Sequence, residues 1–464
     1  MDFAEAVDKH MQDMASKCVA CGKCFEICPM KDPIGLSDAD SKEVTGGIVD
    51  LIRGGDGNEA AIRWAGGCSS SGLCRTVCEY GVDPMFLVKM ASYAHVRRRD
   101  GSEVRKNGAA AFRSSAKSLR MVSRLQLDSA GVSKLQPEFK PSTVVVEQPK
   151  PAVVEQPKPV VVEQPKPVVV EQPKLDVALY LGCNVGKTPH IVLLCVEILQ
   201  AMGLSCELVG GANSCCGINQ FKMGDGETGG RAGLSTLGQI EAKQATTNLT
   251  WCPTCQVQFD STILPAHRIM TGREDVGLTP FFVYLERNLD KLKPLFKHEV
   301  KKRVALNERP GTPDVVHAVE RLLGEIPGIE LVHLDVQRVG LQASYLNVTP
   351  KFKESLRVAE FEAAAKAQVT TLATIFHACH RELCKFENDV SFEIINVIEI
   401  IGESIGLRAE DTYKKLTLAS SIDEAMQSCA HLIAEHGLNP DEAREALLAD
   451  MFAAKPLNGK VLEV

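Results

Sequence analysis

Two adjacent cysteines, Cys215 and Cys216, are the first chemical feature of interest in the sequence. Their Cα atoms are about 3.8 Å apart across a trans peptide, which is shorter than the roughly 4.4–6.8 Å of a relaxed disulfide, so a bond between them would be strained. Cys183, Cys252 and Cys255 complete the pattern C-x31-CC-x35-C-x2-C. Neighbouring thiolates can bind two adjacent metal ions or share one, which is hard to arrange on a regular cubane cluster. The spacing therefore favours a metal centre over a disulfide.

The N-terminal stretch CVACGKCFEICP has the C-x2-C-x2-C-x3-C-P spacing of ferredoxin-type iron–sulfur sites. Three thiolates that are close in sequence can hold three iron corners of a cubane [4Fe-4S] cluster, and the fourth reaches across to a second cluster. The alternatives, zinc or free thiols, do not account for this spacing. The cysteines of the stretch are Cys18, Cys21, Cys24 and Cys28.

A second stretch, CSSSGLCRTVCEYG, matches the same template incompletely. Cys68, Cys74 and Cys78 take the first, third and fourth positions, Ser71 takes the second, and Glu79 stands where proline is usual. An alkoxide is harder and more basic than a thiolate, so this corner can be bound by oxygen, bound by water or left empty. The second cofactor is therefore a [4Fe-4S] or a [3Fe-4S] cluster. Crossed ligation predicts one cluster on Cys18, Cys21, Cys24 and Cys78, and another on Cys28, Cys68 and Cys74 with Ser71 at the odd corner.

The composition favours a globular redox protein. The chain has 464 residues, of which 45% are hydrophobic, a formal net charge of −7, and 17 cysteines. An acidic chain gives no reason to expect nucleic acid as a partner. We find no apolar run of membrane-spanning length, and the acidic residues near the start argue against a secretory signal. The cysteines therefore predict metal or redox chemistry in the cytoplasm, where a partner could still hold the protein at a membrane.

A proline-rich repeat, EQPKPAVVEQPKPVVVEQPKPVVVEQPK, runs from Glu147 to Lys174. Each proline fixes φ and lacks an N–H, and the repeat has no helical apolar face. It predicts an extended spacer that could reach on the order of 85 Å at ~3.1 Å per residue. Residues 111–146 predict a weak basic helix followed by disorder.

The part of the chain after the repeat alternates strand-like and helix-like apolar runs, which is typical of an α/β fold. DVALYLGC and CELVGG predict buried strands that flank the helical run PHIVLLCVEILQAMG. The pattern returns 123 to 124 residues later, where Thr188 aligns with Thr312 and Gln244 aligns with Gln368. An internal duplication into two lobes follows. The glycine-rich run GDGETGGRAG, from Gly224, predicts a flexible turn near the metal centre.

The five-cysteine spacing resembles that of the cysteine-rich, or CCG, domain that occurs twice in the catalytic B subunit of heterodisulfide reductase. The N-terminal part resembles the C subunit of that enzyme, and the fusion of the two resembles the D subunit of its membrane-bound form and related proteins of bacterial sulfur oxidation. The resemblance implies a noncubane [4Fe-4S] cluster that cleaves or forms a disulfide. Its ligands would be Cys183, Cys215, Cys216, Cys252 and Cys255.

The resemblance and the repeats together predict an α+β and α/β multidomain chain. The first unit is an α-helical dicluster ferredoxin-like module at residues 1–110. A basic segment and the Pro/Lys/Val/Glu repeat linker follow at 111–174. Two tandem α/β CCG lobes then occupy 175–295 and 296–405, and a helical tail occupies 406–464.

The second lobe departs from the CCG pattern. Asn307 aligns near Cys183, Arg338 and Val339 align with the cysteine pair, and Phe376 aligns with Cys252, so only Cys379 matches a ligand. One cysteine cannot anchor a second noncubane cluster, and this lobe is predicted to hold no iron. Cys379 remains a candidate catalytic thiol. The stretch FHACHRELC offers further candidates for lining a pocket, for packing or, alternatively, for a separate metal site: His377, His380 and Cys384.

These features predict a disulfide or thiol oxidoreductase subunit of a heterodisulfide reductase-like complex, which passes electrons between ferredoxin-type clusters and a noncubane site that reduces or forms disulfide or sulfane bonds. Lys222, Arg231 and Arg338 could bind an acidic group of a thiol or disulfide substrate. The expected partner is a flavin- or Fe-S-containing A-like subunit, or a membrane quinone or cytochrome subunit. The alternative function is a pure electron relay between a flavin dehydrogenase for lactate, glycolate or glycerol 3-phosphate and quinone.

Overall fold

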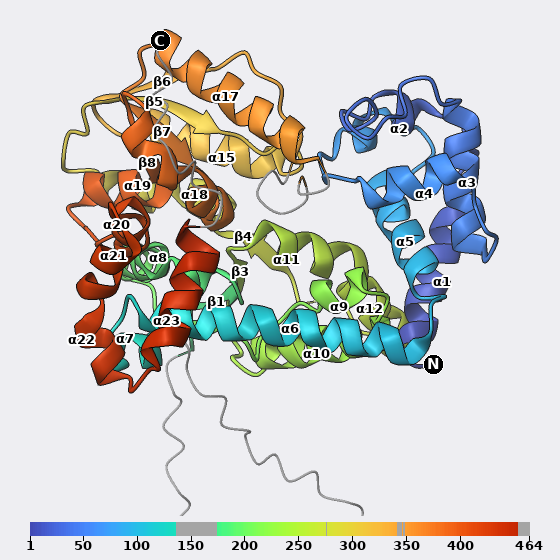
Figure 1. Cartoon of the computed structure of the whole chain (residues 1–464), viewed down its shortest axis with the longest axis horizontal. Coiled ribbons are helices and arrows are strands. Elements are labelled where there is room, and N and C mark those ends of the chain that lie inside the picture. The colour runs from blue at the N-terminus through green and yellow to red at the C-terminus, as the bar shows by residue number, and fades with distance from the viewer. Residues whose placement is uncertain (136–173, 275, 341–345, 347–348, 453–464) are drawn as a thin grey trace, which may run out of the picture.

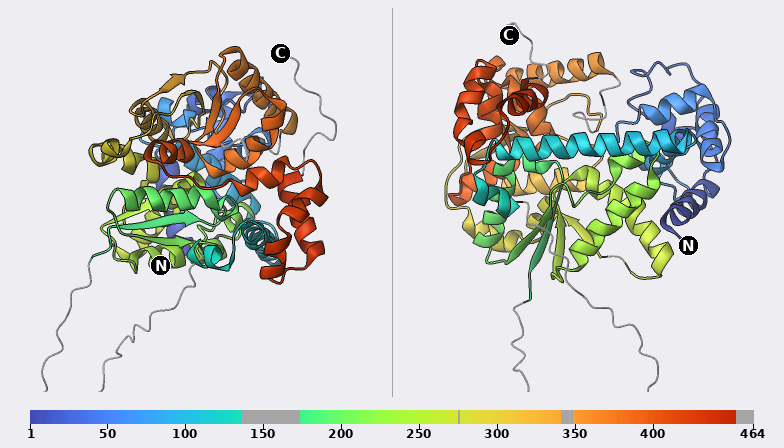
Figure 2. Two further views of the ribbon diagram at one scale, coloured as in Figure 1. Left: turned by 90° about the vertical axis from the view of Figure 1, so that its left-hand side faces the viewer. Right: turned by 60° about the horizontal axis from the view of Figure 1, so that its bottom comes forward.

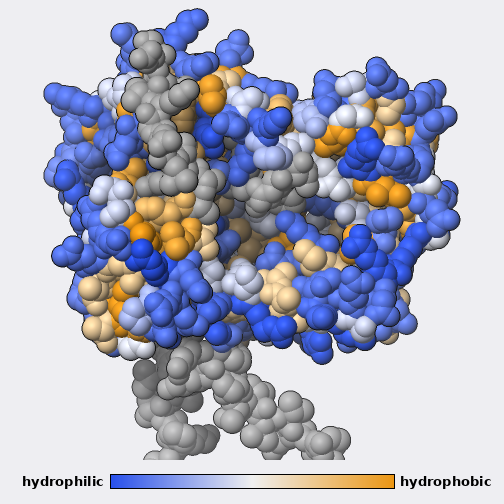
Figure 3. Space-filling view, in the orientation of Figure 1, coloured by the Kyte–Doolittle hydropathy of each residue, from blue (hydrophilic) through white to orange (hydrophobic). Residues whose placement is uncertain are grey.

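The computed structural model describes residues 1–135, 174–274, 276–340, 346 and 349–452 (Figure 1). The predicted proline-rich spacer, apart from Lys174, lies outside these residues. The described part is a mixed α/β protein with two four-stranded parallel sheets. None of the described helices combines the length and the apolar character needed to cross a lipid bilayer. The face shown in Figure 3 is mainly hydrophilic, with apolar side chains gathered in small patches.

The N-terminal cysteines lie in a small helical part, which we call the N-terminal module. Its first helix begins at a capping box, in which the backbone N–H of Glu5 donates to the Asp2 carboxylate and the N–H of Asp2 donates to the Glu5 carboxylate. The cysteines themselves lie in the loops and short helices between the longer helices. The elements are α1 Phe3–Ser16, α2 Lys23–Glu26, α3 Ser41–Arg53, α4 Glu59–Gly66, the 3-10 helix η1 Leu73–Val77 and α5 Pro84–Val96.

The first sheet has the strand order β2-β1-β3-β4, and we call it and its helices the first lobe. The central strand β1 is buried along its whole length, as expected for a parallel sheet that is covered on both faces. The strands are β1 Val177–Gly182, β2 Cys206–Gly210, β3 Thr247–Thr250 and β4 Leu278–Pro280. The helices are η2 Val185–Lys187, α8 Pro189–Ala201, α9 Ile218–Lys222, α10 Gly226–Glu241, α11 Pro253–Gln258, the π-helix η3 Phe259–Ile263, α12 Leu264–Thr271, α13 Phe281–Arg287, α14 Leu289–Leu292 and η4 Lys293–Leu295.

The second sheet repeats this order as β6-β5-β7-β8, and with its helices it forms the second lobe. The repetition extends to single backbone angles, because Gln244 and Gln368 have positive φ values of 50° and 54° shortly before β3 and β7. The two sheets thus share one strand order, as an internal duplication would require. The elements are β5 Lys302–Asn307, α15 Pro313–Gly324, β6 Ile329–Val332, α17 Pro350–Lys366, β7 Thr371–Thr374, α18 His377–Leu383, η6 Cys384–Asp389, β8 Glu393–Asn396 and α19 Val397–Ile405.

The two lobes share one apolar core. Helix α13 packs against α15, and α8 packs against α19. Buried side chains from both lobes meet there, among them Ile198 and Leu285 from the first lobe and Val319 and Ile401 from the second. The shared core fixes the loops of one lobe against those of the other. The C-terminal helices cover the second lobe: α20 Thr412–Leu418, α21 Ile422–Ser428, α22 Ala430–Glu435, α23 Pro440–Leu447 and the π-helix η7 Leu448–Phe452.

Helix α6, Gly101–Arg124, differs from the prediction, because the expected boundary between residues 110 and 111 falls inside it. Asp100 caps the helix, and buried Leu119 and Val122 continue its apolar face well past residue 110. Figure 2 shows α6 as one long helix that runs from the N-terminal module along the first lobe to α23. The described part of the basic segment, residues 111–135, therefore forms the second half of α6 and then α7, Ser129–Leu135.

The N-terminal module docks directly on the first lobe. Helix α1 packs on α10 and α12, and α5 packs on α9. The rings of Phe3 and Tyr93 lie with their centroids 6.1 and 5.3 Å from that of Phe221. One apolar cluster joins the two parts and includes Cys216 and Cys255. The proline-rich spacer therefore does not set the distance between the module and the first lobe.

The glycine-rich run from Gly224, which predicted a flexible turn, forms the first turns of α10 instead. Asp225 caps this helix, because the backbone N–H of Thr228 donates to its carboxylate. A Cβ on Gly229 would lie 2.9 Å from the carbonyl oxygen of Gly217, and a Cβ on Gly230 would lie 2.1 Å from the Phe3 ring. Glycine is needed here because α10 lies against both the Cys-Cys-Gly loop and α1.

Substitution of Gly217 by alanine is expected to destabilise the chain. Gly217 has a φ of 80°, and a Cβ there would lie 2.0 Å from the carbonyl oxygen of Gly229. The positive φ alone costs about 1–3 kcal/mol, so the melting temperature of Gly217→Ala should fall. The control is Gly238→Ala in α10, where a Cβ would have no atom within 4 Å. Alanine should raise the free energy of unfolding there by about 0.5–1 kcal/mol. Equal melting temperatures for the two variants would contradict this packing.

Candidate metal centres

Five cysteines of the first lobe meet because parallel strands deliver their following loops to one edge of the sheet. Cys183 follows β1 directly, and Cys215 and Cys216 lie in the loop between β2 and α9. Cys252 follows β3 as the N-cap of α11, and Cys255 lies in the first turn of that helix. All are reduced thiols, and all but Cys183 are buried.

The five thiols lie close enough to shift one another's pKa values. Cys183 and Cys216 donate to Cys215, which lowers the pKa of Cys215 to about 3. The hydrogen bond with Cys255 likewise lowers the pKa of Cys252. Donation to Cys215 raises the pKa of Cys183 and Cys216. The site thus holds thiolate in an enclosed pocket, which is the form that binds metal.

The backbone around the thiols is shaped to leave room for them. Gly182 has a φ of 73°, and a Cβ there would lie 2.9 Å from Cys255 Sγ. The backbone N–H of Gly217 donates to Cys215 Sγ over 3.3 Å. N–H···S hydrogen bonds and sulfur-only donors are features of protein iron–sulfur sites. The five residues therefore fit an iron–sulfur cluster.

The N-terminal module brings together the two thiol sets that crossed ligation predicts. Cys18, Cys21, Cys24 and Cys78 line one cavity of about 40 Å³, together with apolar side chains such as Ile48. Burial raises the pKa of Cys24 to about 12, with Cys18 and Cys21 adding to the effect. Thiols in such surroundings lose their protons only to a metal, so this set also fits a cluster.

The second set consists of Cys28, Cys68 and Cys74. Burial is the main cause that raises the pKa of Cys28 and Cys74, and each is raised further by Cys68 nearby. The indole N–H of Trp64 donates to Cys28 Sγ over 3.2 Å. Ser71 is buried, and its backbone lies against Gly340 of the second lobe. Ligation through the Ser71 hydroxyl stays a prediction.

Two adjacent cavities connect the second set to the thiols of the first lobe. A cavity of about 270 Å³ has Cys68 and Lys89 on its wall, and a cavity of about 460 Å³ has Cys183, Cys216, Cys252 and Cys255. Ile218, Lys222 and Thr254 line both cavities. The docked module therefore places its second thiol set next to the five-cysteine site.

The larger cavity lies between the lobes, and cationic groups of the second lobe line it together with the thiols. They are Arg309, Arg381 and Lys385, with His377 among them. Burial lowers the pKa of His377 well below its usual value, and Arg381 and Arg309 lower it further, so the imidazole is neutral at neutral pH. Asp450 also lines the cavity and pairs with Lys187 over 2.7 Å.

In the second lobe, an ion-pair network occupies the positions that align with the cysteines. Arg338 pairs with the buried Glu360, whose carboxylate also accepts hydrogen bonds from Asn307 over 2.9 and 2.8 Å. Arg309 donates to the carbonyl oxygen of Gly340 over 2.8 Å and to Cys379 Sγ. The described residues thus fill this site with charged side chains, which is consistent with the expected lack of iron.

Several predicted site residues lie elsewhere than expected. Cys379 contacts Arg309 and is not among the residues that line the larger cavity, so the structure gives it no direct access to a substrate there. Arg338 forms an ion pair with Glu360. Arg231 is exposed on α10, and its guanidinium donates a hydrogen bond to the Thr228 hydroxyl. Of the three cations predicted to bind a substrate, only Lys222 lines the cavity.

The remaining candidates divide between packing and polar contacts. Cys384 is buried in the core of the second lobe, and His380 contacts Asp411 rather than a thiol. Cys195 and Cys429 are buried, whereas Cys206 is partly exposed. Sequence reasoning missed Arg309 and Arg381. A signal for Arg309 existed, because it lies two residues past Asn307 and hence at the strand end that carries Cys183 in the first lobe.

Comparison with known protein families finds a match in the first lobe alone. Residues 177–260 match the cysteine-rich domain family, CCG. No curated protein and no solved structure matches the chain. A cysteine-rich CCG domain indicates an iron–sulfur redox role, and the matched range contains all five cysteines of the first-lobe site.

Removal of Cys216 is expected to abolish one cluster and leave the others. Cys216 is buried among the five thiols of the first lobe, so Cys216→Ala should lower the iron content of anaerobically purified protein by about four atoms per chain, from about 11–12. The matched control, Cys206→Ser, removes a thiol outside the three sets and should keep all the iron. Unchanged iron in Cys216→Ala would contradict the assignment.

Proposed function

We propose that the chain is the iron–sulfur subunit of a heterodisulfide reductase-like complex that reduces or forms disulfide or sulfane bonds. The observation that carries the proposal is the cavity of about 460 Å³ between the lobes, which is lined both by four thiols of the first lobe and by cationic side chains of the second. A bound cluster accounts for the space beside the thiols, but a subunit that only relayed electrons would not need the cationic side chains that line the rest of the cavity.

The cationic part of the cavity lining suits a small anionic thiol or disulfide. Arg381 and Lys385 can hold a carboxylate, sulfonate or phosphate group, and guanidinium does so with two parallel hydrogen bonds. Neutral His377 can form a hydrogen bond with the sulfur of a substrate thiol. Reduction of a disulfide consumes two electrons and two protons and yields two thiols.

The docked module supports electron exchange with the cavity. When bound, iron–sulfur clusters supply one-electron exchange and an iron atom that can take a substrate sulfur. Two observations support an order from the Cys18 set through the Cys68 set to the Cys216 set: Cys24 is close enough to raise the pKa of Cys74, and Cys68 lines a cavity that shares wall residues with the cavity of Cys216. The docking of α1 and α5 on the first lobe holds this order without help from the spacer.

The redox partner is proposed to bind where the Cys18 set meets the surface. Three large apolar side chains surround this set and remain exposed: Val19 at 58%, Ile27 at 38% and Tyr80 at 46%. An apolar patch around a shallow cluster suits transient docking of a second redox protein. A flavin- or Fe-S-containing subunit, or a membrane quinone or cytochrome subunit, would supply or remove electrons there.

Titration of the oxidised protein with thiols, followed by EPR spectroscopy, distinguishes the enzyme from the relay. A low-molecular-weight anionic thiol should change the spectrum, because it can enter the cavity beside Cys183 and Cys216. The same titration of Cys216→Ala should leave the spectrum unchanged. A wild-type spectrum that does not respond to any thiol or disulfide would favour the relay function.

Arg381 is expected to bind the anionic part of the substrate. Loss of one charged hydrogen bond costs about 1.5–3 kcal/mol, so Arg381→Gln should raise KM for an anionic thiol about 10-fold or more. The KM for a neutral thiol should change little. Arg408→Gln, on a side chain that is 84% exposed, is the control and should leave both unchanged. Equal losses for anionic and neutral thiols in Arg381→Gln would show that Arg381 only supports the fold.

A further inference from the structure

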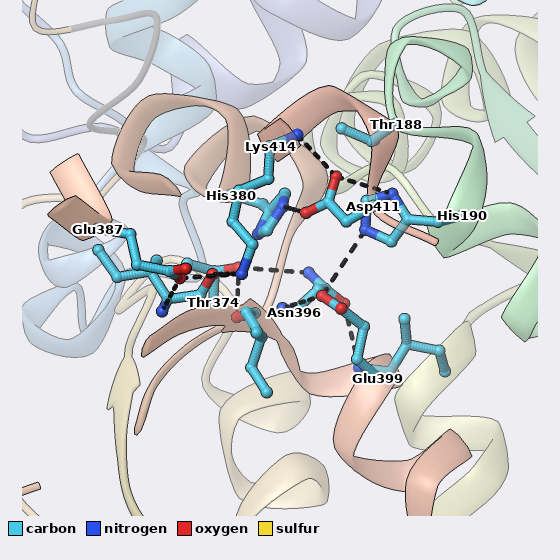
Figure 4. A network of polar contacts seen from close by, with 12 residues as sticks. Thr188, His190, Thr374, His380, Glu387, Asn396, Glu399, Asp411 and Lys414 are labelled. Carbon is cyan, nitrogen blue, oxygen red and sulfur yellow. Dashed lines mark hydrogen bonds and ion pairs between the residues drawn. The ribbon is translucent and has the colours of Figure 1, made fainter. Parts of the chain in front are cut away.

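A second group of metal-type donors lies buried between the two lobes, away from all the cysteine sets. It consists of His190, His380, Glu399 and Asp411, and one ligand atom from each lies within 4.8 Å of all the others. Figure 4 shows His190 between Glu399 and Asp411, with His380 on the other side of Asp411. The four residues come from α8, α18, α19 and the start of α20.

Among the described residues, His190 of this group has no hydrogen-bond partner. His190 is 1% exposed, and neither of its ring nitrogens makes a hydrogen bond. Its Nδ1 lies 3.4 Å from an Asp411 oxygen and its Nε2 lies 3.7 Å from a Glu399 oxygen, beyond good hydrogen-bond distance. A fully buried imidazole with two unsatisfied nitrogens between two carboxylates points to a missing cation.

The carboxylates of Asp411 and Glu399 both have oxygen lone pairs left with which to bind a cation. Asp411 accepts a hydrogen bond from the backbone N–H of Lys414 over 2.9 Å, and Glu399 accepts one from the N–H of Asn396 over 2.7 Å. These are ordinary helix caps, and each uses only part of its carboxylate. The Nε2 of His380 lies 2.6 Å from the other Asp411 oxygen. A cation between them would replace this hydrogen bond.

The charges also favour a divalent ion. As metal ligands, two imidazoles are neutral and two carboxylates carry a net charge of −2, which one divalent ion cancels. Carboxylates that stay ionised inside a protein need a cation, and imidazole nitrogen with carboxylate oxygen is a common donor set for zinc.

We propose that His190, His380, Glu399 and Asp411 bind one Zn²⁺ ion. Four protein donors complete a tetrahedral site and leave no position for a substrate, so the ion is structural. Donors bound at ~2.0 Å lie roughly 3.3 Å apart in a tetrahedron, which shifts of about 1 Å would reach from the present arrangement. Ligation does not depend on the cysteine clusters.

The site would hold the second lobe at the angle that shapes the cavity. His190 belongs to the first lobe, and the other three ligands belong to the second lobe and the start of its C-terminal helices. His380 lies one helical turn after His377, which lines the cavity. The ion would therefore link the packing of α8 against α19 to the position of α18.

Zinc analysis with X-ray absorption of the full anaerobic chain tests the proposal. We expect about one zinc per chain, surrounded by nitrogen and oxygen at about 2.0 Å with no sulfur at about 2.3 Å. The distinction matters because zinc that enters an empty cysteine site would show the sulfur distance. Protein free of zinc, or zinc with sulfur neighbours only, would overturn the proposal.

Two variants locate the ion. His190→Gln and Asp411→Asn should each lose the zinc and its nitrogen and oxygen shell while they keep the wild-type iron content. His431→Gln, on an exposed side chain of α22, is the matched control and should keep the zinc. Zinc retained in both ligand variants would contradict the site, and the wild-type spectrum decides the question even if a variant fails to fold.

Discussion

The structure depends on one electrostatic constraint, which is the gathering of five thiols in a buried pocket of the first lobe. Each thiolate in such a group raises the cost of the next, and the hydrogen bonds among Cys183, Cys215, Cys216, Cys252 and Cys255 relieve this only in part. Metal ions remove the constraint, because they replace the protons and neutralise the charge. The tight glycine turns and the docking of α10 all serve to bring these thiols together.

The second lobe has the same sheet arrangement as the first but places different side chains at its edge. Its sheet has the same strand order, and its loops reach the same edge, but Arg338 and Glu360 neutralise each other there without metal. Its helix α18 contributes His377 and Arg381 to the cavity that four thiols of the first lobe also line.

The parts of this architecture that sequence reasoning could reach are those set by local spacing. The cysteine runs predicted which thiols would meet, and the aligned Gln244 and Gln368 predicted the duplication, because each signal lies in a short stretch of chain. Gly229 and Gly230 suggested a turn, yet they form a helix, because the need for close packing against α1 is not visible locally. The group around His190 combines residues more than two hundred positions apart, which no single motif could reveal.

Anomalous X-ray scattering at the iron edge, from crystals of anaerobically prepared protein, tests the central claim most directly. The account predicts iron at three places: the Cys18 set, the Cys68 set, and the five cysteines of the first lobe. It also predicts no iron beside Arg309, Arg338 and Cys379 in the second lobe. Iron in the second lobe, or disulfides in place of iron among the five cysteines of the first, would contradict it.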